Sequence, residues 1–144
     1  MNTSDDPPLH DLLFVYGTLR HGCSGAQARR LAGESERLGE ARIVGLLYRI
    51  GSYPGLCVGK AGETGNGAVT GDLVRLHDPA ATLAWLDAYE ETGPAFPEPW
   101  EYRRCLLDVT AAGGATPAWA YIYGWPVDGL MPLAEGDWLA QGGA

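Results

Sequence analysis

Near the start of the chain, an apolar run ends abruptly in a glycine-containing turn, in the sequence LLFVYGTLR at residues 12–20. The run over residues 12–16 predicts a buried strand. Gly17 lets the backbone turn sharply and lets another molecule approach the main chain closely. Exposed N–H groups at such a turn can bind an anion, typically a carboxylate or a phosphate, and Thr18 adds a hydroxyl. We therefore expect backbone donors to converge at the end of this first strand.

A strand followed by glycine and threonine is also a common structural turn, so these residues alone leave both interpretations open. The turn is not a Walker phosphate loop, because the G-x-x-x-x-G-K-[ST] spacing is absent. The spacing of Gly17, Gly22 and Gly25 also does not match the G-x-G-x-x-G pattern of dinucleotide-binding proteins. The sequence gives little support for a phosphotransferase, since no magnesium-binding pattern accompanies the turn.

The charge and length of the chain limit its partners and its size class. The 144 residues carry a formal net charge of −8, which argues against nucleic acid or an anionic membrane as a partner. The length predicts one domain, over residues 11–140, preceded by a flexible tail at residues 1–10. The 21 glycines and 10 prolines predict many turns and loops between strands.

The first ten residues lack the basic and apolar regions of a signal peptide, and no apolar run approaches the length of a membrane span. The three cysteines are scattered without a C-x-x-C pair, and the three histidines have no metal-ligand spacing. We therefore expect free thiols, no metal and a cytoplasmic protein.

The pattern of apolar residues and breakers predicts strands that surround two helices. The shorter helix is expected at residues 26–31, and the longer one at residues 80–90, where Asp78 can cap the N-terminus, Pro79 fits the first position and Gly93 ends the helix. On the strand at residues 117–124, both faces are apolar, as in a closed or covered sheet. The other strands are expected at residues 12–16, 41–50, 56–59, 68–76 and 102–109.

One acidic residue lies at the edge of the apolar face of the longer helix. Leu83, Leu86 and Glu90 fall on one stripe, while Asp87 and Glu91 are expected to face solvent. Partial burial and the negative end of the helix dipole both raise the pKa of a carboxyl group at the Glu90 position. A carboxylate with a pKa nearer neutrality is a better general base and general acid. A surface glutamate at a frayed helix end is the alternative.

Five blocks of sequence, taken in order, resemble the γ-glutamylcyclotransferase-like family, which includes the AIG2-like proteins. They span residues 12–138, nearly the whole chain, and their order is more specific than any single block. The blocks are YGTLR at residues 16–20, LDAYE at residues 86–90, YRR at residues 102–104, AWAYIY at residues 118–123 and GDW at residues 136–138.

The resemblance implies an α+β fold: a small mixed β-barrel or curved sheet with a few short helices. It implies a cofactor-independent enzyme that cyclises a γ-glutamyl group, of a γ-glutamyl amine or amino acid, to 5-oxoproline and releases the amine. Glu90 aligns with the family's catalytic glutamate. The partner implied is a small γ-glutamyl substrate, and we expect a monomer or weak dimer. The substrate-binding residues implied are Tyr16, Gly17, Thr18, Leu19, Gly55, Tyr102 and Tyr123.

The chain departs from the family pattern next to this glutamate. The family often has glycine in the position that Glu91 occupies, and the following segment, residues 92–101, is long and contains three prolines. Phe96 and Trp100 in this segment either line a pocket for the leaving amine or fix the segment to the body of the protein. A non-catalytic module that binds a small metabolite on the same fold is the alternative function, because a fold alone does not establish catalysis.

Overall fold

A computed structural model of the protein describes residues 10–20, 23, 25–50, 53–58, 67–127, 129–133 and 136–138. The tail expected at residues 1–10 lies outside this range except for its last residue. The elements in chain order are β1 (Leu12–Val15), α1 (Ala26–Gly33), β2 (Ser35–Val44), β3 (Leu46–Arg49), β4 (Pro54–Cys57), β5 (Ala68–Leu76), α2 (Pro79–Glu90), β6 (Tyr102–Ala111), β7 (Gly114–Tyr123) and β8 (Met131–Pro132).

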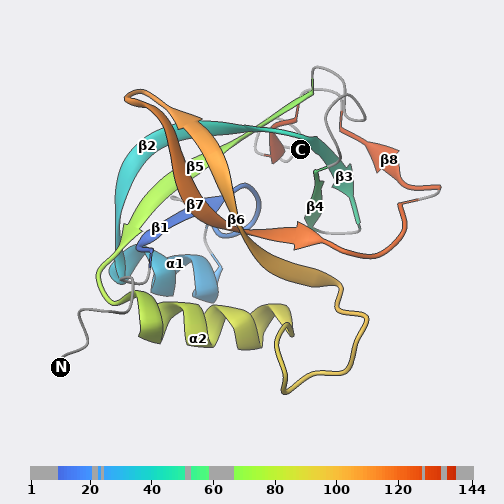
Figure 1. The fold of residues 1–144 in the computed structure, drawn as a ribbon, viewed down its shortest axis with the longest axis horizontal. Coiled ribbons are helices and arrows are strands. Elements are labelled where there is room, and N and C mark those ends of the chain that lie inside the picture. The colour runs from blue at the N-terminus through green and yellow to red at the C-terminus, as the bar shows by residue number, and fades with distance from the viewer. Residues whose placement is uncertain are drawn as a thin grey trace, which may run out of the picture.

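Five strands form a closed barrel in the order β1-β5-β2-β6-β7, and a separate three-stranded sheet has the order β4-β3-β8 (Figure 1). β1 and β7 close the barrel as a parallel pair, with Leu13 opposite Trp119, and the other neighbours in the barrel run antiparallel. The expected mixed α+β barrel is thus confirmed. Within the described residues, neither helix is long and apolar enough to cross a bilayer.

Alternation along β1 divides the core into two layers. Phe14 and Tyr16 belong to one buried cluster, which contains the small and branched side chains of the barrel strands. Leu13 and Val15 point the other way and pack in a second cluster with Leu86 of α2. Because successive side chains of a strand alternate between faces, one short strand contributes to both clusters.

The predicted burial of both faces of β7 is confirmed by the same two clusters. Ala118, Ala120 and Ile122 pack in the first cluster, and Tyr121 and Tyr123 pack in the second. The small residues therefore face the more crowded layer, while the tyrosines face the helices and the region where β1 ends.

Both ends of α2 are fixed by hydrogen bonds. Asp78 caps the N-terminus as predicted, since its carboxylate accepts a bond from the N–H of Ala81 at 3.3 Å. The helix ends at Glu90 as predicted, but the left-handed residue that follows it is Glu91, at φ 58° and ψ 47°, and not the predicted Gly93. The N–H of Thr92 then reaches back to the carbonyl of Asp87 at 3.0 Å, so the chain turns before it reaches the glycine.

The strand expected at residues 41–50 is two strands. β2 begins earlier, at Ser35, and ends at Val44, while β3 starts after Gly45 and joins the second sheet. A Cβ at Gly45 would lie 2.8 Å from the carbonyl oxygen of Cys57, so the break is a close approach of two backbones. The start of β2 was missed because residues 35–40 are mostly polar and exposed and have no apolar alternation.

Gly71 on β5 is expected to tolerate no side chain. A Cβ there would meet the carbonyl oxygen of Val15 and would lie 2.7 Å from the ring of Phe14, so Gly71→Ala must push β1 away from β5. We expect the free energy of unfolding, measured with urea, to fall by about 1–3 kcal/mol. Gly113→Ala is the control, because a Cβ at that turn meets nothing within 4 Å. Equal midpoints for the two variants would contradict this packing.

Candidate active site

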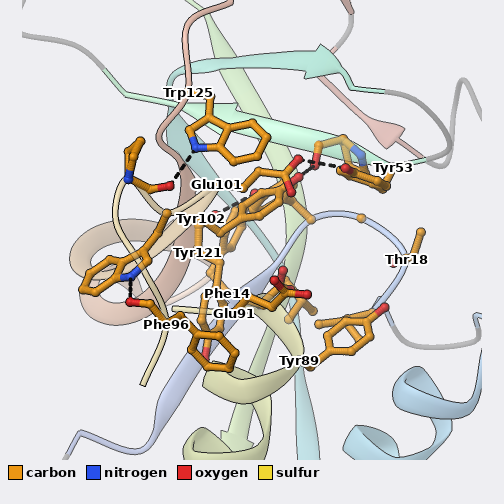
Figure 2. Close-up of a pocket in the computed structure, with 18 of the residues that line it drawn as sticks. Phe14, Thr18, Tyr53, Tyr89, Glu91, Phe96, Glu101, Tyr102, Tyr121 and Trp125 are labelled. Carbon is orange, nitrogen blue, oxygen red and sulfur yellow. Dashed lines mark hydrogen bonds between the residues drawn. The ribbon is translucent and has the colours of Figure 1, made fainter. Parts of the chain in front are cut away.

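A cavity of about 620 Å³ opens where β1, the end of α2 and the segment after α2 meet (Figure 2). Its walls come from the turn after β1, from residues 89–91 and from residues 96–102, with Tyr53 and Pro54 at one side. Within the described parts of the chain, no group of three or more His, Cys, Asp and Glu side chains is placed to hold a metal ion. The described lining residues instead provide carboxylates, hydroxyl groups and backbone N–H groups.

The turn after β1, where the sequence predicts backbone donors, forms part of the wall of the cavity. Gly17, Thr18 and Leu19 all line it, and the N–H of Arg20 donates to the carbonyl of Gly17 at 3.1 Å. Among the described residues, the N–H groups of Thr18 and Leu19 have no hydrogen-bond acceptor. A Cβ at Gly17 would lie 2.6 Å from Cγ of Pro54, so glycine permits the close approach of the turn to β4.

Tyr16 lines the cavity with its ring, while its hydroxyl group is used inside the protein. The hydroxyl donates to the carbonyl of Tyr121 at 2.6 Å and accepts from the N–H of Leu56 at 3.2 Å. Burial raises the pKa of Tyr16 well above its ordinary value, so the phenol stays protonated and remains a donor. Tyr16 thus ties together β1, β7 and β4 around the cavity.

Arg20 anchors the end of the turn after β1, and this positioning role was not predicted from the sequence. Its guanidinium is buried, with contacts of 2.9 Å to Asp137 and 3.3 Å to Asp72 on β5. Asp72 also binds Arg37 at 2.9 Å. The first and last sequence blocks of the resemblance are therefore joined by an ion pair, which the sequence signals only through their co-occurrence.

Glu90, the predicted catalytic residue, lies at the C-terminal end of α2 and lines the cavity. Its carboxylate has no hydrogen-bond partner in the part of the chain that the structure describes. Burial, assisted by the nearby charge of Glu101, raises the pKa of Glu90 to about 7. The side chain is therefore placed to exchange protons with a molecule in the cavity near neutral pH.

Asp87 does not face solvent, contrary to the prediction from the helix alone. Its carboxylate accepts from Nε and Nη2 of Arg104 at 2.9 and 3.1 Å and from the hydroxyl of Tyr121 at 2.7 Å. The guanidinium of Arg104 also stacks on the ring of Trp119 at 4.3 Å. The helix packs against strands β6 and β7 at this point, so the face that looked polar in the sequence meets a cation and a phenol.

A second carboxylate, Glu101, lines the cavity and was not predicted as a site residue. The hydroxyl of Tyr53 donates to Oε2 of Glu101 at 2.8 Å, and this bond raises the pKa of Tyr53 to about 12. Tyr102, which was predicted, also lines the cavity, but its hydroxyl donates to the carbonyl of Pro54 at 2.7 Å. The sequence signal that could have identified Glu101 as a site residue is its position directly before the YRR block.

Two predicted binding residues lie outside the lining of the cavity. A Cβ at Gly55 would lie 2.8 Å from the ring of Tyr123, so these two residues pack against each other. The ring of Tyr123 also makes an edge contact with Tyr102 at 5.5 Å between centroids. Gly55 and Tyr123 thus support the wall that Tyr102 presents to the cavity.

The segment after α2 forms one side of the cavity and is held by hydrogen bonds from two indole N–H groups. Phe96 and Trp100 both line the cavity, and the indole N–H of Trp100 donates to the carbonyl of Phe96 at 3.1 Å. The indole N–H of Trp125 donates to the carbonyl of Pro99 at 3.1 Å. Phe96 and Trp100 therefore line the cavity, and the hydrogen bond between them lies within the segment.

Glu91 departs from the family pattern and also has an unusual backbone conformation. It is exposed, lines the cavity, and has positive φ, which L-residues with a side chain rarely adopt. This conformation costs about 1–2 kcal/mol for a residue other than glycine. A glycine at this position, as often occurs in the family, would avoid that cost.

Comparison with known proteins identifies the class to which this fold and cavity belong. Residues 13–140 match the family described as "Gamma-glutamyl cyclotransferase, AIG2-like". The gamma-glutamylcyclotransferase family protein YtfP of Escherichia coli K12 is 37% identical over 134 residues, which cover 88% of this chain and 95% of that protein. The chain is therefore a member of the γ-glutamylcyclotransferase-like, AIG2-like family.

Solved structures agree with this assignment. The solution structure of the Escherichia coli protein ytfP has a TM-score of 0.62 and 36% identity, covering 91% of this chain and 98% of that chain. The crystal structure of an AIG2-like protein from Mus musculus has a TM-score of 0.63 at 21% identity, covering 83% and 82%, and shows likeness of fold.

Replacing Glu90 with glutamine is expected to change stability in a pH-dependent way. The carboxyl group has a folded-state pKa of about 7 against an ordinary value of 4.5, so ionisation destabilises the folded protein as the pH rises between these values. We expect Glu90→Gln to match the wild type at pH 4 and to be more stable by about 1–3 kcal/mol at pH 8. Urea unfolding at both pH values measures this.

Glu40→Gln, an exposed site on β2, removes the same charge and is the control for that comparison. A gain in Glu90→Gln that is the same at pH 4 and pH 8 would contradict a desolvated carboxylate at residue 90.

Replacing Glu91 with glycine is expected to stabilise the protein by about 1 kcal/mol, because glycine adopts positive φ without steric conflict. Glu91→Ala removes the same carboxylate but keeps the Cβ, so it should show no such gain. Thermal unfolding of the two variants beside the wild type measures the difference. Equal stabilisation by both would mean that charge, and not backbone conformation, is responsible.

Proposed function

We propose that this protein cyclises a γ-glutamyl group to 5-oxoproline and releases the attached amine, with Glu90 as general base and then general acid. The observation that carries the proposal is the position of Glu90. Glu90 lines the same cavity as the turn after β1, its carboxylate has no partner among the described residues, and burial raises its pKa to about 7. Membership of the family supports the class of reaction.

The reaction needs one nucleophilic attack and three proton transfers, two of which pass through Glu90. Glu90 accepts a proton from the α-ammonium group of the substrate, and the freed amine attacks the γ-carbonyl carbon to form a five-membered ring. The bond from that carbon to the leaving nitrogen then breaks, Glu90 gives its proton to the leaving nitrogen, and the ring nitrogen releases its second proton to solvent, which leaves the neutral lactam. A carboxylate at a pKa of about 7 accepts the first proton more readily than one at the ordinary value of 4.5.

The turn after β1 would hold the α-carboxylate of the substrate. The N–H groups of Thr18 and Leu19 are the donors that the described structure leaves without acceptors, and such groups bind anions. Fixing the carboxylate brings the amine close to its own γ-carbonyl, and an oriented intramolecular attack is strongly favoured over an unoriented one.

Release of 5-oxoproline from γ-glutamyl amines and γ-glutamyl amino acids tests this proposal. We expect Glu90→Gln to lower kcat about 10²–10⁴-fold, because general acid–base catalysis contributes that much. For the wild type, kcat/KM should fall about tenfold per pH unit below pH 7, where Glu90 becomes protonated. Glu40→Gln is again the control.

Full activity in a folded Glu90→Gln protein would overturn the assigned mechanism. Saturable thermal stabilisation of the wild type by γ-glutamyl compounds without turnover would instead indicate a binding module on the same fold.

A further inference from the structure

The cavity is larger than a γ-glutamyl group requires. A water molecule occupies about 30 Å³ in the liquid, and we take this volume as an upper limit for each non-hydrogen atom of the substrate. The nine non-hydrogen atoms of the γ-glutamyl group then fill less than about 270 Å³. The cavity measures about 620 Å³, so more than half of it remains for the leaving amine. The side chains that line this remaining space determine which amines fit.

The charged side chains of the cavity are all acidic. Glu90, Glu91 and Glu101 line it, and no Lys, Arg or His is present among the described lining residues. Glu90 is assigned to proton transfer, whereas Glu91 and Glu101 exchange no proton with the substrate in the proposed reaction. An anionic leaving group would meet two carboxylates without a compensating cation, which is unfavourable in a partly enclosed site.

Aromatic side chains surround the same space. Tyr53, Tyr89, Phe96, Trp100 and Trp125 all contribute to the lining, and Figure 2 shows the labelled Tyr53, Tyr89, Phe96 and Trp125 around the labelled Glu91 and Glu101. The faces of aromatic rings attract cations electrostatically, and tryptophan does so most strongly. Carboxylates beside aromatic faces are a combination suited to an ammonium or guanidinium group.

We propose that the leaving amine carries a second, positively charged group, and that Glu91 and Glu101 recognise it. This inference rests on the proposed cyclisation and extends it to the class of substrate, a γ-glutamyl amide of a diamine or a similar cationic amine. Recognition of the cation depends on the charges of the two carboxylates and on the faces of the aromatic rings. An amide of the same length with a neutral or anionic end should therefore bind less well.

The two recognition carboxylates are held in place by different means. Oε2 of Glu101 accepts from Tyr53 at 2.8 Å, and Oε1 has no partner among the described residues. Glu91 follows Glu90 directly and ends α2 in the left-handed conformation, which glycine would adopt more easily. Residues other than glycine with positive φ cluster at functional sites, and Glu91 has this conformation on the wall of a cavity.

Three matched substrates test the inference: the γ-glutamyl amides of 1,4-diaminobutane, butylamine and 4-aminobutanoate, which share one chain length and differ in terminal charge. With the wild type at pH 8, we expect kcat/KM for the cationic amide to exceed that for the neutral amide about tenfold. The anionic amide should be the poorest of the three. Equal values for the cationic and neutral amides would overturn the proposal.

Glu91→Gln and Glu101→Gln should each lower the preference for the cationic over the neutral amide about threefold to tenfold. For Glu91→Gln, kcat/KM for the neutral amide should stay close to that of the wild type. Glu101→Gln is judged by the ratio of the two amides alone, because the charge of Glu101 also raises the pKa of Glu90. Glu40→Gln, which lies outside the cavity, should keep the wild-type preference. An unchanged preference in both cavity variants would also overturn the proposal.

Binding of the same three amides to Glu90→Gln, measured by calorimetry, separates this inference from the proposed reaction. Preference for the cationic amide without turnover by the wild type would support the cation site and reject the cyclisation. Turnover of all three amides with equal affinities would support the cyclisation and reject the cation site. Neither turnover nor binding would reject both.

Discussion

The paired carboxylate of Asp87 fixes the geometry on which the candidate site depends. Its bonds to Arg104 and Tyr121 hold the last turn of α2 against strands β6 and β7 of the barrel. Glu90 lies one turn further along the same helix, so its position relative to the cavity follows from that attachment. The helix thus presents one satisfied carboxylate to the barrel and, to the cavity, one carboxylate that has no partner among the described residues.

Much of the fold could be predicted from local sequence signals. Asp78 and Pro79 marked the start of α2, and the apolar pattern located β5, which spans Ala68–Leu76 as expected. Elements without such signals were missed or misplaced. The polar start of β2 is a strand because β5 offers it hydrogen bonds over its whole length, and that partner is not visible in the sequence around Ser35.

The site was predictable to the extent that its residues lie in recognisable blocks. Glu90, Tyr102 and the turn at residues 16–19 all line the cavity. Glu101 and the role of Asp87 were not predicted, because each depends on a partner that is distant in sequence. Helical periodicity places Asp87 on a polar face but does not reveal that Arg104 and Tyr121 cover it.

The hydrogen bond from Tyr16 to Tyr121 joins residues that are 105 positions apart in the chain. The first strand also pairs with the last strand of the barrel, at Leu13 and Trp119. During synthesis, the turn after β1 therefore emerges long before the strands that enclose it. The cavity is completed only when β7 is available. Such non-local closure slows folding and leaves the apolar first strand exposed in the nascent chain, so this barrel depends on reaching its full length before proteases or aggregation intervene.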